Sequence, residues 1–196
     1  MYISGKSAKE VAQNALKDCW KTIFNGNGYD IDNQKMLTDR GNWRFDSGVD
    51  AILRYTEPKN IELFENLKVL SGEECKSRQN IMLGQYIGIV EMEALCLFDM
   101  IQQYIIPSLK KAELSDSISN TYEKSLFNAL DTLENALADI NSSDDDIIKA
   151  KKCRKLRLET MIELRKLCDQ VEAIVPANEW NLATYKELLF IDLHVK

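Results

Sequence analysis

The chain has 196 residues, a formal net charge of −6 at pH 7 and 45% hydrophobic residues. This length can supply one domain with a substantial core, and the acidic balance argues against a large nucleic-acid interface, which needs a concentrated basic face. The basic run Lys149–Arg157 directly follows the acidic run Asp144–Asp146, an alternation of sign that is typical of a solvated helix face rather than of a phosphate site.

Apolar residues recur at steps of three and four along nearly the whole chain, so the sequence predicts an all-α fold. The first helix is expected to begin near Ser7, because Ser7 and Glu10 have the spacing of a capping box. Its apolar stripe runs to Ile23, and the turn at Gly26, Asn27 and Gly28 should stop it, since these residues tolerate positive φ. Short helices are predicted next from Asp30 or Asp32 to Gly41, from Ser47 to Arg54, and from Pro58 to about Leu67.

The centre of the chain predicts a helix of about 35 residues, or about 50 Å at ~1.5 Å per residue. A second capping box, at Ser71 and Glu74, marks its start. Pro107 should kink or end it, because proline has no N–H to donate. One apolar stripe, called the seam below, runs along this helix through Leu83, Ile87, Val90, Ala94, Leu97, Ile101 and Tyr104.

Two more long helices are predicted after Pro107, separated by a break at Asn141 and ending before Pro176. We therefore expect an antiparallel bundle of three long helices. Residues 1–70 should form a region of short helices in the same domain, and residues 71–196 the bundle with a C-terminal segment.

The C-terminal segment carries too much apolar surface for a free tail. We predict that it docks on the bundle or on a neighbouring chain, with Trp180 largely buried. Its apolar members are Trp180, Leu182, Tyr185, Leu188, Leu189 and Phe190.

Little in the sequence points to catalysis or to metal binding. The five cysteines are odd in number and form no Cys-x-x-Cys motif, which fits reduced thiols in a cytoplasmic protein. The single histidine, His194, makes a zinc site improbable. Glu93 is expected to form a structural hydrogen bond or ion pair with Arg78, Arg154 or Arg165 rather than to hold a metal.

The sequence also argues against a nucleotide-binding loop and against a membrane span. The Gly26–Gly28 turn lacks the Lys-Ser/Thr of a phosphate loop and does not have the spacing of a dinucleotide-binding loop. No apolar run approaches the ~20 residues of a membrane span. We therefore expect neither nucleic acid nor membrane as a partner.

Several segments resemble type III glutamine synthetases in order and spacing. The carboxyl end resembles that family through Met161–Val175, Trp180 and Thr184–Phe190. Earlier matches extend the resemblance over residues 17–190: Phe24-Asn25-Gly26-Asn27-Gly28-Tyr29, Arg40-Gly41, Ser77-Arg78, Tyr86, Glu93, Asp99-Met100 and Ile105-Ile106-Pro107. The chain departs from the family at Asn181-Leu182-Ala183, where the family usually has prolines, and residues 191–196 run past the usual end.

The resemblance implies a non-catalytic, C-terminal helical region of an ATP-dependent glutamate–ammonia ligase of nitrogen metabolism. It implies that the catalytic part, with its ATP and magnesium, would lie before residue 1, and that this chain holds no cofactor. Its partner would be the glutamine synthetase catalytic region or another copy of itself, as in the ring-shaped oligomers of the family. The alternative is a stand-alone helical protein–protein interaction module. An enzyme with a novel active site in the bundle is a third hypothesis, which the missing histidine and metal-ligand clusters disfavour.

Overall fold

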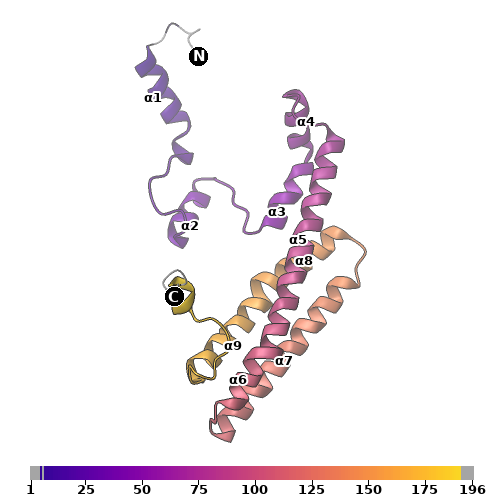
Figure 1. Ribbon diagram of the computed structural model, residues 1–196. Coiled ribbons are helices and arrows are strands. Elements are labelled where there is room, and N and C mark those ends of the chain that lie inside the picture. Colours follow the sequence, from indigo (N-terminus) through magenta and orange to yellow (C-terminus); the bar gives the residue numbers. More distant parts are fainter. Residues whose placement is uncertain (1–4, 6, 191–196) are drawn as a thin grey trace. The chain divides into compact units, whose positions relative to one another are not determined.

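The computed structural model describes residue 5 and residues 7–190, and this part of the chain is helical without a strand (Figure 1). The chain forms two compact units, the first ending at Asp46 and the second beginning at Ser47. The units therefore divide the chain at a different place from the predicted regions 1–70 and 71–196. The all-α prediction is confirmed.

The first unit contains two short helices. Helix α1, Ala8–Asp18, starts at the predicted capping box: Ser7 Oγ accepts from the Glu10 N–H at 3.3 Å, and Glu10 Oε2 accepts from the Ser7 N–H at 2.9 Å. It ends at Asp18, earlier than the predicted stop at Gly26, and a 3-10 turn follows at Trp20–Thr22. Helix α2, Ile31–Asp39, is capped by Asp30.

The second unit opens with two more short helices, which begin where the sequence predicts. Helix α3, Gly48–Leu53, is capped by Ser47. Helix α4, Pro58–Asn66, has its proline in the first turn, where the missing N–H costs no hydrogen bond.

The longest helical rod spans 40 residues, Gly72–Lys111. It consists of α5, Gly72–Met100, a π-helical turn at Ile101–Ile105, and α6, Ile106–Lys111. The rod continues past Pro107 rather than ending there. Proline 107 leaves the carbonyl of Gln103 without its usual α-helical donor, and Gln103 lies inside the π-helical turn, where the backbone already departs from the α-helical pattern.

This π-helical turn changes which residues face the core. Ile101 is buried as predicted, but Tyr104, the next predicted seam residue, is 43% exposed and Ile105 is buried instead. A π-helical turn accommodates one more residue than an α-helical turn, so the apolar stripe moves from position 104 to position 105.

Two further rods complete the second unit. The second rod is α7, Asp116–Asn141. The third comprises α8, Asp146–Lys155, a second π-helical turn at Leu156–Thr160, and α9, Met161–Ile174. The apolar period of this rod predicts a stripe through Leu156, Leu164, Leu167, Val171 and Ile174. Leu156, Leu164 and Val171 are buried, whereas Leu167 and Ile174 are partly buried and Cys168 is buried as well.

The three rods lie alongside one another (Figure 1), and together with Val49 of α3 they supply the core of the second unit. Helix α5 packs on α8 and α7, while α7 packs on α6 and α9. Helix α9 also contacts the π-helical turn that follows α5, so the third rod runs along the first. The precise antiparallel packing stays a prediction, which these contacts support. A last short helix, α10, spans Tyr185–Leu189.

Candidate functional site

The turn at Gly26–Tyr29 leads into α2 and does not end α1. Asn27 Oδ1 accepts from the Tyr29 N–H at 3.0 Å, which closes the turn. A Cβ placed on Gly26 would lie 2.7 Å from the Phe24 ring. A side chain at position 26 would therefore require the Phe24 ring to shift. Gly26 does not have the positive φ expected of this turn. Tyr29 is 93% exposed and packs on nothing within its unit.

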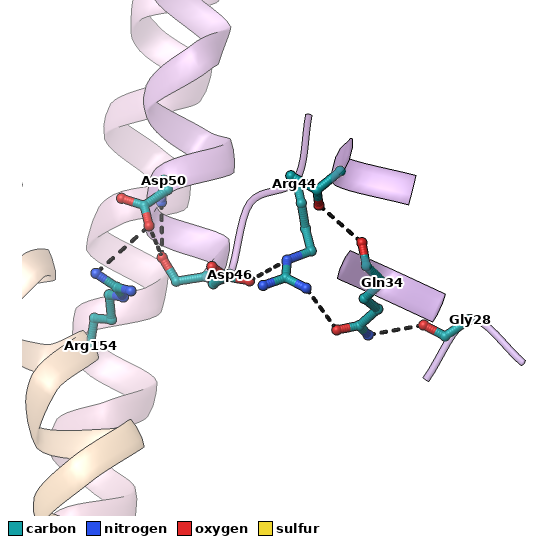
Figure 2. Close-up of polar contacts among 8 residues, drawn as sticks. Gly28, Gln34, Arg44, Asp46, Asp50 and Arg154 are labelled. Atoms are coloured by element: carbon teal, nitrogen blue, oxygen red, sulfur yellow. Dashed lines mark hydrogen bonds and ion pairs between the residues drawn. The ribbon is translucent and has the colours of Figure 1, made fainter. Parts of the chain in front are cut away.

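A chain of polar contacts joins this turn to the end of the first unit (Figure 2). The Gly28 carbonyl accepts from Gln34 Nε2 at 2.9 Å, and Gln34 Oε1 accepts from Arg44 Nη1 at 2.9 Å. Arg44 Nε in turn lies 2.7 Å from Asp46 Oδ1. These contacts give the loops of the first unit a defined shape, although none of the residues described in this unit is buried.

The Arg40-Gly41 pair ends α2. Gly41 has φ +89°, the left-handed conformation that favours glycine after a helix. Arg40 lies over the Trp20 ring at 5.6 Å and donates to the Ile23 carbonyl at 3.2 Å. Arg40 therefore holds the segment between α1 and α2 against the end of α2.

Glu93 forms an ion pair, but with a residue that the sequence analysis did not name. Arg157 Nη2 donates to Glu93 Oε1 at 3.0 Å. The predicted partner Arg154 instead faces Asp50 at 3.7 Å (Figure 2). Arg157 lies in the second π-helical turn, which the sequence pattern does not reveal. Burial raises the pKa of the nearby Tyr86, against the opposing effect of Arg157.

The segment after α9 packs on the bundle only in its first part. Trp180 and Leu182 are partly buried against the core, and they line a pocket of about 420 Å³ together with Leu188 and residues of α5 and α9. Leu189 is 77% exposed, and Leu188 and Phe190 are also largely exposed. Trp180 is thus partly rather than largely buried, and the Leu-Leu-Phe end does not pack on the bundle of this chain. Docking of this end on a neighbouring chain, the other predicted alternative, stays a prediction. The side chain of Tyr185, like all of His194, lies outside the described residues.

One contact of this segment was missed by the sequence analysis. Asn181 Nδ2 donates to Ser108 Oγ at 3.2 Å, and Ser108 is one of the few buried polar residues. Asn181 stands in the stretch that departs from the family's prolines. No local sequence pattern could have paired Asn181 with Ser108, because the serine lies on the first rod, 73 positions earlier in the chain.

Neither metal ligands nor activated nucleophiles gather in the described part of the chain. Within residues 5 and 7–190, no group of three His, Cys, Asp or Glu side chains could hold a metal ion. Burial raises the pKa of both Cys153 and Cys168 to about 11. Such thiols remain protonated at neutral pH and are poor nucleophiles. Asp99 is exposed on α5, and Pro107 is partly buried in α6.

The rod Gly72–Lys111 is long and apolar enough to cross a membrane, with a mean hydropathy of 1.5 over its most apolar window. The expectation that no apolar run approaches the length of a membrane span is therefore wrong for this rod. The core helix of a soluble protein can have the same length and apolar composition. Only 22% of that window is buried inside the structure, so much of its apolar surface faces outward.

Comparison with known proteins gives consistent results. The family described as "Glutamine synthetase C-terminal domain" matches residues 7–125. The chain is 25% identical to the type-3 glutamine synthetase of Dictyostelium discoideum over 93% of its length, and 27% identical to the glutamine synthetase of Butyrivibrio fibrisolvens over 95%. It spans only 28% and 31% of the length of these two relatives.

Proposed function

Because this chain belongs to the glutamine synthetase C-terminal domain family, we propose that it is a non-catalytic, structural region of a type-3 glutamine synthetase. Its task is to support the catalytic region or to hold subunits together. The parent reaction, ATP-dependent ligation of ammonia to glutamate in nitrogen metabolism, belongs in this proposal to sequence outside the match. ATP and magnesium would be bound there, and the protein would act in the cytoplasm.

The observation that carries the proposal is the exposure of apolar side chains in the first unit. Its helices are capped and its loops are hydrogen-bonded, yet none of its described residues is buried. Instead it exposes large apolar side chains: Leu16, Trp20, Ile23, Tyr29, Ile31 and Trp43. Exposed apolar surface of this extent marks a contact with another protein surface.

The family match supports the same conclusion. It begins at residue 7 and includes the whole described part of this coreless unit apart from Gly5. A shared sequence pattern in a segment without a core is better explained by a shared contact than by internal packing.

The proposal is tested with the Dictyostelium relative from which the region matching this chain has been removed. We expect the present chain to co-elute with that truncated enzyme in size-exclusion chromatography. The chain alone, given glutamate, ammonia, ATP and magnesium, should release no phosphate above background.

A surface variant makes the test specific. Tyr29→Ser combined with Ile31→Ser removes exposed side chains and should abolish co-elution without loss of helicity. Phe127→Ser, an exposed change on α7, serves as the matched control and should bind normally. Turnover by the chain alone would contradict the proposal, and absence of co-elution would favour the stand-alone interaction module.

A further inference from the structure

A pocket lies where the segment after α9 packs on the bundle. Its volume is about 420 Å³, within the range of ~300–1,000 Å³ that is typical of pockets for small organic molecules. The first rod, α9 and the segment after α9 each supply part of its wall, and all three belong to the second unit. What this pocket binds is therefore a separate question from what the first unit contacts.

Most of the pocket wall is apolar. Leu97 and Ile105 line the pocket from the first rod, and Leu182 and Leu188 line it from the segment after α9. The ring of Trp180, partly buried against the core, adds an aromatic surface. These side chains suit the apolar part of a ligand, because removing apolar surface from water favours binding.

The charged residues that line the pocket all come from α9, and one of their charges is unshared. Arg165 Nε lies 2.6 Å from Asp169 Oδ1, so these two charges compensate each other. Glu172 is only partly exposed, and within the described part of the chain it makes neither a hydrogen bond nor an ion pair. The Cys168 thiol adds no charge at neutral pH, because burial raises its pKa to about 11.

A carboxylate and an aromatic ring in one pocket form a site for a cation. The carboxylate attracts the positive charge directly, and the face of an indole ring attracts it through the ring quadrupole. We propose that this pocket binds an organic ammonium ion that carries an apolar group. The ammonium group pairs with Glu172 and contacts the Trp180 ring, and the apolar group occupies the space between the leucine side chains.

The charges of the pocket disfavour other classes of small molecule. An amino acid or a nucleotide would place its own carboxylate or phosphate against Asp169 and Glu172, and these like charges repel. An inorganic ammonium ion has no apolar group to cover the pocket wall. The expected ligand therefore differs from the substrates of the proposed parent reaction, and the inference goes beyond that function.

Three probes with the same phenyl group test the charge preference of the pocket. Phenethylamine, phenethyl alcohol and phenylpropionate are cationic, neutral and anionic at neutral pH. In calorimetric titrations of the full chain, we expect the amine to bind about tenfold more tightly than the alcohol, and phenylpropionate to bind more weakly than either. Equal affinity for the amine and the alcohol, tighter binding of phenylpropionate, or no binding of the amine would overturn the proposal.

A change of one carboxylate tests the role of Glu172. Glu172→Gln should lower the affinity for phenethylamine about tenfold, to that of the alcohol, and should leave the affinity for the alcohol unchanged. Glu134→Gln, an exposed change on α7, alters the net charge of the chain equally and should change neither affinity. Equal losses in the two variants would show that net charge attracts the amine, and the proposal would be wrong.

Filling the pocket tests the location of the site. Ala183 lines the pocket and is exposed, so Ala183→Trp should occupy the pocket without disturbing the core and should abolish amine binding. Ala177→Trp, an exposed change earlier in the same segment, is the matched control and should bind normally. Circular dichroism checks that both variants keep their helicity. Undiminished binding by a folded Ala183→Trp variant would place the ligand elsewhere and overturn the proposal.

Discussion

Among single residues, the cysteines differ most in their surroundings. Burial raises the pKa of Cys153 and Cys168 to about 11 from an ordinary value of 9.0, so at neutral pH their thiolate fraction falls about a hundredfold. Cys75 is also buried, whereas Cys19 and Cys96 are exposed.

We expect two of the five thiols to react rapidly with a thiol reagent and three to react slowly. With dilute protein near neutral pH, a disulfide reagent such as DTNB should label Cys19 and Cys96 rapidly and the other three only on unfolding. Mass mapping of the labelled peptides identifies the sites. Rapid labelling of Cys153 in the folded protein would contradict its burial.

The capping box at the start of α5 predicts a pH effect. The Ser71 backbone and side chain donate to the Glu74 carboxylate, and these bonds hold the pKa of Glu74 below its ordinary value of 4.5. A lowered pKa means that the bonds stabilise the folded state above the unfolded pKa, and that this contribution is lost as the pH falls through the folded pKa.

Glu74→Ala should therefore lower the free energy of unfolding near neutral pH, and the deficit should shrink at about pH 3. Ser71→Ala should cost about 1 kcal/mol. Denaturant unfolding at the two pH values measures both effects. Ser77→Ala, an exposed change within the helix, is the control, and a pH-independent deficit for Glu74→Ala would contradict the capping role.

Among the elements, helix starts could be predicted from sequence but π-helical turns could not. Ser7, Asp30, Ser47 and Ser71 each cap the helix that follows, because a cap depends on a side chain and on backbone groups two or three residues away. A π-helical turn leaves no such local mark. Its position is decided by how the rods pack against one another.

The first π-helical turn predicts unequal costs for two neighbouring substitutions. Ile105→Ala removes a buried side chain and should reduce the free energy of unfolding by about 2–5 kcal/mol. Tyr104→Ala removes a half-exposed ring and should cost clearly less. Urea unfolding of both variants measures the two losses in free energy of unfolding. A larger loss for Tyr104→Ala than for Ile105→Ala would place the seam at Tyr104, as the ~3.6-residue period predicts.

For the molecule as a whole, the core belongs to the second unit alone. Its first member in the chain is Val49 and its last is Val175, with Trp180 and Leu182 packed against it. The sequence could indicate the apolar period of the rods. It could not pair Glu93 with Arg157 or Ser108 with Asn181, because these contacts join residues 64 and 73 positions apart.

Two truncations should therefore differ in effect. Removing residues 1–46 leaves every buried residue in place and should leave the melting temperature nearly unchanged. Removing residues 178–196 takes away Trp180 and Leu182, which pack against the core. This truncation should lower the melting temperature by roughly 5 °C or more. Calorimetry with circular dichroism provides the measurement, and a large loss from the first truncation would mean that the first unit stabilises the second.

The two π-helical turns also have a consequence for chain length. Each is equivalent to a single-residue insertion in a helix, absorbed locally without displacing the turns on either side. A homologue that lost one residue between Leu97 and Leu109 would revert to a continuous α-helix there and keep both ends of the rod facing the core. Gaps of one residue at these two positions, rather than in the loops alone, are therefore where we expect the lengths of related helical regions to diverge.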